Sequence, residues 1–310
     1  MLPTVTVGKV PAKSITTKGS TESYSGRTGA SLAAVSAQAE RLGADALWAC
    51  DHLFWPHHIV ECFSALAIAA SATSHVALGT CILQLPLRDA PTVAKQAATL
   101  QHLADGRFIL GLGVGSHEGE YTTAGIDFAT RGRRMDDSLA ALSRAWDGDP
   151  DARYRLDPGP RVPLWFGGFG PASLRRTGAM GDGWIPVFLT PEDYRLGLDR
   201  LADAAVAAGR TPGDIVRAVV VFLRVGAAER AHAAGSDWLS SLYGIPPRAF
   251  ARHLVSGPAD DCAGVIDAYR QAGAQHVAVM VADNEPLEHF EALHAALGAG
   301  ASQSAMEVSA

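Results

Sequence analysis

The chain has 310 residues, a formal net charge of −6 and a hydrophobic fraction of 48%, which suits a globular α/β protein with one large domain. It has no basic stripe or run of Lys and Arg, so nucleic acid and anionic membrane surfaces are excluded as expected partners, and a small molecule is expected instead. No apolar run approaches the length of a membrane span and no N-terminal secretory pattern is present, so we expect a cytoplasmic location.

Short β-branched or aromatic runs alternate with longer Ala- and Leu-rich stretches of helical period, a pattern that predicts repeated βα units. The predicted strands cover residues 4–8, 46–50, 76–81, 107–114, 162–168, 183–188, 219–225 and 276–282. The predicted helices cover residues 29–42, 61–74, 91–104, 132–147, 171–181, 191–208, 260–273 and 286–297. About eight strands with following helices are what a (β/α)8 TIM barrel requires, whereas an open doubly wound sheet normally has fewer. We therefore predict an α/β TIM barrel.

Two segments interrupt this alternation. Residues 11–28 are polar and follow the predicted first strand, and residues 229–257 form a helical insertion before the last βα unit. Insertions of this length usually cover or line a site. Residues 1–298 are expected to form a single domain, and residues 299–310, which are small and polar, are expected to be a disordered tail.

The stretch LWACDHLFW, residues 47–55, places an Asp-His pair at the end of the predicted second strand. In a TIM barrel this end faces the active site, and a buried carboxylate is costly unless it is paired. His52 could donate a proton or bind a cofactor, with Asp51 setting its tautomer. The alternative is a capping Asp beside a surface His. Phe54 and Trp55 could wall an apolar pocket, and Trp48 is expected to be a packing residue.

Two glycine-rich segments also follow predicted strands. GLGVG, residues 111–115, lacks the glycine spacing of a dinucleotide fingerprint, and its glycines either let a flat ring approach the backbone or merely ease packing. GGFGP, residues 167–171, places glycines before a helix that opens with Pro171. Such a turn either directs main-chain N–H groups at a phosphate, with Arg175 and Arg176 nearby, or is an ordinary tight connection.

A metal site is not expected. His52, His57, His58 and Glu61 resemble a ligand cluster, but HxH and HExxH spacings are absent, and such loops are often solvated surface. The four cysteines have no CxxC spacing, so they are expected to be reduced packing residues. They are Cys50, Cys62, Cys81 and Cys262.

Four motifs, taken together and in order, resemble the bacterial luciferase-like superfamily, and within it most closely the coenzyme F420-dependent oxidoreductases. The motifs are DHLFWP at 51–56, a segment at 78–121 that begins LGTCILQLPLRD and ends GLGVGSHEGEY, RGRRMDD at 131–137, and VPLWFGGFGPASLRRTGAMGDGWIP at 162–186. The match runs from about residue 30 to 190 and more weakly from 257 to 297. It implies a (β/α)8 barrel that binds FMN or the deazaflavin F420 at its C-terminal mouth, commonly as a homodimer.

The resemblance also implies roles for individual residues. His52 would be the acid or hydrogen-bond donor beside the central ring of the cofactor, with Asp51 holding it. Cys81 and Ile82 occupy the position where the family often has a non-proline cis peptide against the ring. The remaining implied cofactor-binding residues are Gly113 and Gly115, which would leave room for the ring, and Gly168, Phe169 and Gly170, which match the phosphate-binding turn.

The favoured activity is hydride transfer between F420 and a small organic substrate. FMN-using members often have an Arg near Val114 and an acid and a hydroxyl in the GGFG turn, and their absence favours F420. A second candidate is an FMNH2- and O2-dependent monooxygenase of the Baeyer-Villiger or hydroxylating type. With either activity a separate flavin or F420 reductase is a possible partner. A barrel hydrolase that is metal-dependent or cofactor-free is a third candidate, and a non-catalytic cofactor-binding subunit is a fourth.

Overall fold

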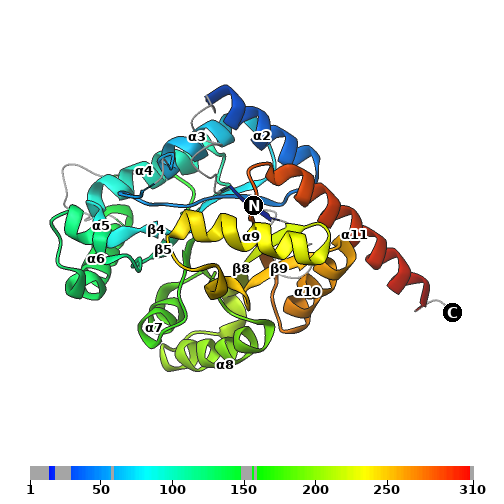
Figure 1. The fold of residues 1–310 in the computed structure, drawn as a ribbon. Coiled ribbons are helices and arrows are strands. Elements are labelled where there is room, and N and C mark those ends of the chain that lie inside the picture. The colour runs from blue at the N-terminus through cyan, green and yellow to red at the C-terminus, as the bar shows by residue number, and fades with distance from the viewer. Residues whose placement is uncertain (1–13, 18–28, 57–58, 148–155, 157–158, 308–310) are drawn as a thin grey trace.

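The computed structural model describes residues 14–17, 29–56, 59–147, 156 and 159–307. Within this part of the chain, eight parallel strands pair in a ring (Figure 1). β10 pairs with both β8 and β1, which closes the ring and confirms the predicted TIM barrel. The strands of the ring are β1 (Ser14–Thr17), β2 (Ala46–Ala49), β3 (Ala77–Thr80), β5 (Phe108–Gly113), β6 (Leu164–Phe166), β7 (Gly183–Trp184), β8 (Val216–Val225) and β10 (His276–Val281).

Helices surround this ring (Figure 1). They are α2 (Gly29–Arg41), α3 (Cys62–Ala72), α4 (Ala90–Leu103), α6 (Arg131–Asp147), α7 (Pro171–Met180), α8 (Pro191–Ala207), α10 (Ala259–Gln271) and α11 (Pro286–Glu307). Two of them begin at typical helix-start residues. Asp89 and Thr190 cap the first turns of α4 and α8, and a proline lies in the first turn of each. None of the helices within the described ranges is both long enough and apolar enough to cross a bilayer.

Shorter elements extend the connections at the mouth of the barrel. The strand β4 (Leu83–Gln84) pairs with β5, and the helix α5 (Glu118–Thr123) follows β5. The predicted insertion 229–257 contains α9 (Ala228–Tyr243), the 3-10 turn η4 (Pro247–Phe250) and β9 (Leu254–Gly257), which pairs with the end of β8. Three further 3-10 turns are η1 (Leu85–Leu87), η2 (Phe128–Thr130) and η3 (Pro212–Asp214).

The first strand differs from the predicted one. β1 is Ser14–Thr17, inside the segment 11–28 that was predicted as an insertion, and it lies between β10 and β2. Its β-branched residues suit a strand. Residues 4–8, which were predicted to form this strand, lie outside the described residues.

The C-terminal helix also differs from its prediction. α11 continues to Glu307, into the segment 299–310 that was predicted to be disordered. The Ala, Gln, Met and Glu residues of this segment favour a helix, whereas Gly298 and Gly300 do not.

Aromatic side chains of β2, β6 and β10 pack together in the interior of the barrel. The rings of Trp48 and Trp165 lie 5.2 Å apart, and both lie 5.6 Å from the imidazole of His276. Trp48 Nε1 donates a hydrogen bond of 3.2 Å to His276 Nε2. Complete burial lowers the pKa of His276 to about 4, so the ring is neutral at pH 7 and can accept this bond. Trp48 is therefore a packing residue, as predicted.

Candidate active site

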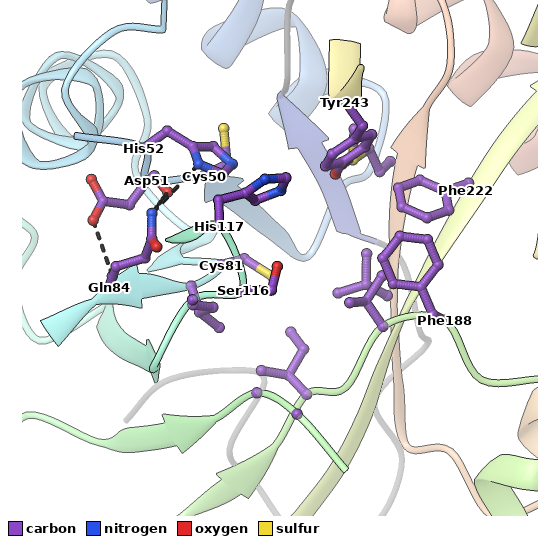
Figure 2. A pocket seen from close by; sticks show the side chains of 18 residues that line it. Cys50, Asp51, His52, Cys81, Gln84, Ser116, His117, Phe188, Phe222 and Tyr243 are labelled. Carbon is purple, nitrogen blue, oxygen red and sulfur yellow. Dashed lines mark hydrogen bonds between the residues drawn. The ribbon is translucent and has the colours of Figure 1, made fainter. Parts of the chain in front are cut away.

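The carboxyl ends of the strands surround a cavity that is partly open to solvent (Figure 2). The exits of β2, β3, β5, β6 and β7 all contribute to its lining. The predicted residues that line it are Asp51, His52, Cys81, Ile82, Gly115 and Gly168. The peptide bond between Cys81 and Ile82 is cis, as the family resemblance implied.

His52 is held by a carboxylate from a distant part of the chain. Its Nδ1 lies 2.9 Å from Glu120 Oε2, and the two side chains are only 11% and 2% exposed. Glu120 also accepts hydrogen bonds from the Phe54 amide and from Gln84 Nε2. Burial acts to raise the pKa of Glu120, but the hydrogen bonds from His52, Gln84 and Phe54 act the other way and leave it lowered. Glu120 is therefore an ionised carboxylate at pH 7.

Asp51 does not hold His52, contrary to the prediction. Its carboxylate accepts from Arg88 Nε at 3.2 Å, from Arg88 Nη2 and from the Gln84 amide at 3.0 Å. Successive residues of an extended segment point to opposite sides, so neighbours in the sequence enter different environments. The Asp51 carboxylate is almost fully buried, and the charge of Arg88 compensates its desolvation. Asp51 is thus part of a buried ion pair beneath the site.

Gln84 connects these two groups. Its side-chain Nε2 donates to both carboxylate oxygens of Glu120, at 3.2 and 3.1 Å, and to the carbonyl of Asp51 at 3.1 Å. Its main-chain N–H donates to the Asp51 carboxylate. The sequence analysis missed Gln84, Arg88 and Glu120. The signals that could have found them are a Gln inside the apolar run LQLPL and a Glu directly after the glycine-rich strand, in HEGEY.

The glycines of the segment 111–115 make room for the chain's own side chains. A Cβ on Gly113 would lie 2.4 Å from Ile82 Cδ1, and one on Gly115 would lie 1.9 Å from Gln84 Oε1. Gly113 is not among the lining residues, and its lack of a side chain makes room for Ile82, which is; its predicted place beside a cofactor ring stays a prediction. Gly115 lines the cavity and also allows the approach of Gln84.

The turn between β6 and α7 places glycines before the first N–H groups of α7. Gly168 has φ +81°, a left-handed conformation that glycine adopts readily, and a Cβ on Gly170 would meet open space. Gly168 is anchored from below, because Trp184 Nε1 donates a 2.8 Å hydrogen bond to its carbonyl. Phe169, between the two glycines, is half exposed. The first N–H groups of α7 have no partner within the helix, so a phosphate could accept from them.

The two arginines predicted beside this turn are placed differently. Arg176 is buried and forms a salt bridge of 2.6 Å with Asp136 on α6. Arg175 lines a hollow between α7 and α8 together with Arg200, and Phe169 and Pro171 of the turn line the same hollow.

The apolar side of the cavity comes from the segment after β7 and from β8, α9 and β10 (Figure 2). We call the six residues of this side the aromatic wall: Val187, Phe188, Val220, Phe222, Tyr243 and Met280. The lining within the described ranges does not include Phe54 or Trp55, and their role as pocket walls stays a prediction. Phe54 is 42% exposed, and Trp55 packs on the His52 ring with their centroids 3.9 Å apart.

Of the candidate metal ligands, the structure describes His52 and Glu61, which make separate contacts. Within the described ranges, no group of three His, Cys, Asp or Glu side chains could hold a metal ion. Glu61 caps the start of α3, where its carboxylate accepts from the amides of Phe63 and Ser64. His57 and His58 lie outside the described residues. None of the four cysteines forms a disulfide bond.

Comparisons with known proteins agree with this geometry. A family model described as luciferase-like monooxygenase matches residues 13–236. The chain is 30% identical over 274 residues to phthiodiolone/phenolphthiodiolone dimycocerosates ketoreductase of Mycobacterium tuberculosis, which covers 74% of this chain and 71% of that protein. It is 34% identical over 213 residues to F420-dependent glucose-6-phosphate dehydrogenase of Kineococcus radiotolerans, covering 62% of this chain and 63% of that protein.

Solved structures show the same fold. An F420-dependent secondary alcohol dehydrogenase in complex with an F420-acetone adduct has a TM-score of 0.79, with 20% identity, 93% of this chain and 99% of that chain covered. The oxygenating constituent of 3,6-diketocamphane monooxygenase from Pseudomonas putida, in complex with FMN, has a TM-score of 0.72, with 17% identity, 92% of this chain and 96% of that chain covered.

Proposed function

Because the chain belongs to the luciferase-like monooxygenase family, and is thus a flavin- or deazaflavin-dependent oxidoreductase, we propose that its cofactor is F420 and that it moves a hydride to or from a carbon atom that bears oxygen. The curated relatives named above are a ketoreductase and an F420-dependent dehydrogenase of a sugar phosphate. Both names describe the interconversion of a carbinol and a carbonyl carbon or its equivalent. When bound, F420 would supply a ring carbon that gives or takes the hydride.

The observation that carries this proposal is the contact between His52 and Glu120 at the edge of the cavity. Reduction of a carbonyl needs a proton at the oxygen atom, and oxidation of an alcohol needs a base there. With Nδ1–H donated to the Glu120 carboxylate, Nε2 is the ring atom that can exchange this proton. The carboxylate also stabilises the imidazolium that forms when His52 takes the proton from an alcohol.

The residues that would hold the cofactor fit its two chemically distinct parts. Ile82, raised beside the cis peptide, and Gly167 offer a surface for a flat ring. The turn at Gly168 and Gly170 and the start of α7 would hold a phosphate through main-chain N–H groups. The fit of this turn rests on space that a side chain at Gly170 would fill.

Titration of the purified chain with F420 and, separately, with FMN tests the choice of cofactor. We expect F420 to have the lower dissociation constant of the two cofactors, as measured by the change in cofactor fluorescence. Tighter binding of FMN, together with O2 consumption when FMNH2 is supplied, would instead support monooxygenase activity.

The role of His52 needs a separate measurement. His52→Ala should lower turnover by about 10² to 10⁴-fold, the usual contribution of general acid-base catalysis, with little change in the dissociation constant of F420. Near-normal turnover by this variant would remove His52 from the proton-transfer step.

A further inference from the structure

The cavity has two chemically different sides. Its polar side includes His52, Gln84 and His117, and the aromatic wall lies across from them (Figure 2). Such a division lets one end of a ligand exchange a proton while the other end is removed from water.

The aromatic wall is a packed cluster rather than a set of separate side chains. The Phe188 and Phe222 rings lie 5.1 Å apart, and Tyr243 lies 6.4 and 6.2 Å from them. Phe250 and His253 pack behind Phe188, with ring centroids 6.2 and 5.7 Å away. Side chains that hold one another in this way keep their shape when a ligand arrives, which lowers the entropy cost of binding.

Phe188 carries a second sign that its position serves a ligand. Its φ is +62°, in the left-handed region that bulky side chains rarely adopt. Such a conformation is unfavourable and persists only where the surroundings determine it, commonly at ligand sites. Here the neighbouring aromatic rings provide those surroundings.

The indole of Trp55 lies between His52 and Tyr243 of the aromatic wall. Trp55 packs on His52, its ring lies 6.1 Å from Tyr243, and its Nε1 donates a 2.9 Å hydrogen bond to the Leu242 carbonyl. A substrate whose oxygen lies at His52 can therefore rest its carbon skeleton on the aromatic wall without spanning a long distance.

The charges of the described lining residues argue against one class of substrate. Among the described residues of the lining there is no Lys or Arg, and the nearby Arg88 is committed to Asp51 and Glu61. A phosphate or carboxylate group on the substrate would instead approach the buried carboxylate of Glu120, at a large desolvation cost without a paired cation.

Resting on the proposed function, we infer that the substrate is an uncharged alcohol or ketone with an alicyclic or aryl body, which packs against the aromatic wall with its oxygen at His52. This substrate class differs from the sugar phosphate named for one of the relatives.

The test compares 1-phenylethanol and cyclohexanol with glucose 6-phosphate, using the purified full chain with F420. We expect kcat/KM, measured by the loss of oxidised F420 absorbance, to be at least about tenfold higher for 1-phenylethanol than for glucose 6-phosphate. Tyr243→Ala should lower kcat/KM for 1-phenylethanol by about tenfold with an unchanged dissociation constant for F420, since tenfold corresponds to about 1.4 kcal/mol, within the range for one aromatic contact. Tyr243→Phe should retain the wild-type value. Leu196→Ala, on the exposed face of α8, is the control.

A binding measurement without cofactor separates the two proposals. Saturation-transfer NMR should show that acetophenone binds the wild-type chain and the Leu196→Ala variant but binds Tyr243→Ala and Phe222→Leu more weakly. F420 binding with preferred turnover of glucose 6-phosphate would overturn the substrate inference and leave the proposed function standing. Failure to bind F420 would overturn the proposed function, and acetophenone binding that is the same in all four proteins would overturn the inference.

Discussion

Replacing Glu120 by Gln should lower kcat by about 10- to 150-fold. The substitution keeps the size of the side chain and keeps an acceptor for Gln84 and the Phe54 amide, but it removes the charge 2.9 Å from His52 Nδ1. A hydrogen bond to a charged group contributes about 1.5 to 3 kcal/mol. At about 1.36 kcal/mol for each tenfold change in rate, this range gives the stated loss if the bond is needed when His52 carries the proton.

The assay is steady-state turnover with F420 and an alcohol, at pH 7, beside a fluorescence titration of the cofactor. Glu118→Gln is the matched control, since Glu118 lies on the same helix, carries the same charge and is exposed. We expect the Glu118 variant to keep its kcat and both variants to keep their affinity for F420. Equal losses of kcat in the two variants would show that the net charge of α5, and not the contact with His52, is what matters. An unchanged kcat in the Glu120 variant would refute the reasoning directly.

Three further predictions concern the cofactor turn, the buried ion pair and the barrel interior. Gly168→Asp should raise the dissociation constant of F420, measured by fluorescence, because it sets a carboxylate against a phosphate; an unchanged constant would place the phosphate elsewhere. Arg88→Met should lower the free energy of unfolding, measured in urea, by about 3 to 5 kcal/mol, because it leaves the buried Asp51 carboxylate unpaired. Arg161→Met breaks an exposed pair and should change this free energy by less than about 1 kcal/mol. An equally small effect of both variants would contradict the role of the Arg88–Asp51 pair. Because His276 is neutral in the folded chain, the unfolding free energy should fall by about 3 kcal/mol as the pH drops from 6.5 to 4, since only the unfolded chain binds a proton at this residue. His276→Gln should flatten this pH dependence. A variant with a slope as steep as that of the wild type would contradict the prediction.

Much of the barrel could be predicted, because parallel strands that are buried on both faces appear in the sequence as continuous apolar runs. β2, β3, β5 and β10 lie within one or two residues of their predicted ends. β7 is shorter than its predicted range, 183–188, because Pro186 has no N–H for a strand ladder. β1 could not be placed, since SITT is less apolar than the competing run at 4–8 and only its pairing with β10 and β2 identifies it.

The site was predictable only in its local part. His52 is marked by its place directly after a strand, and that signal holds in the structure. Its partner Glu120 is 68 positions away, and no periodicity relates two residues that meet only when α5 folds over the mouth of the barrel. Assembly as a homodimer, a cytoplasmic location and a separate reductase stay predictions, each of which depends on molecules other than this chain.

The hydrogen bond between Trp184 and Gly168 connects the proposed phosphate turn to α8. The indole of Trp184 rests against Gly197 on α8, where an added methyl group would come within 2.5 Å of Trp184 Cη2. A larger residue at position 197 would therefore displace either the indole or α8, and a displaced indole would strain its bond to the Gly168 carbonyl. If Gly168 holds the cofactor phosphate as proposed, substitutions at position 197 would change cofactor affinity from a helix that does not touch the cofactor, and relatives that differ at position 197 should differ at position 184 as well.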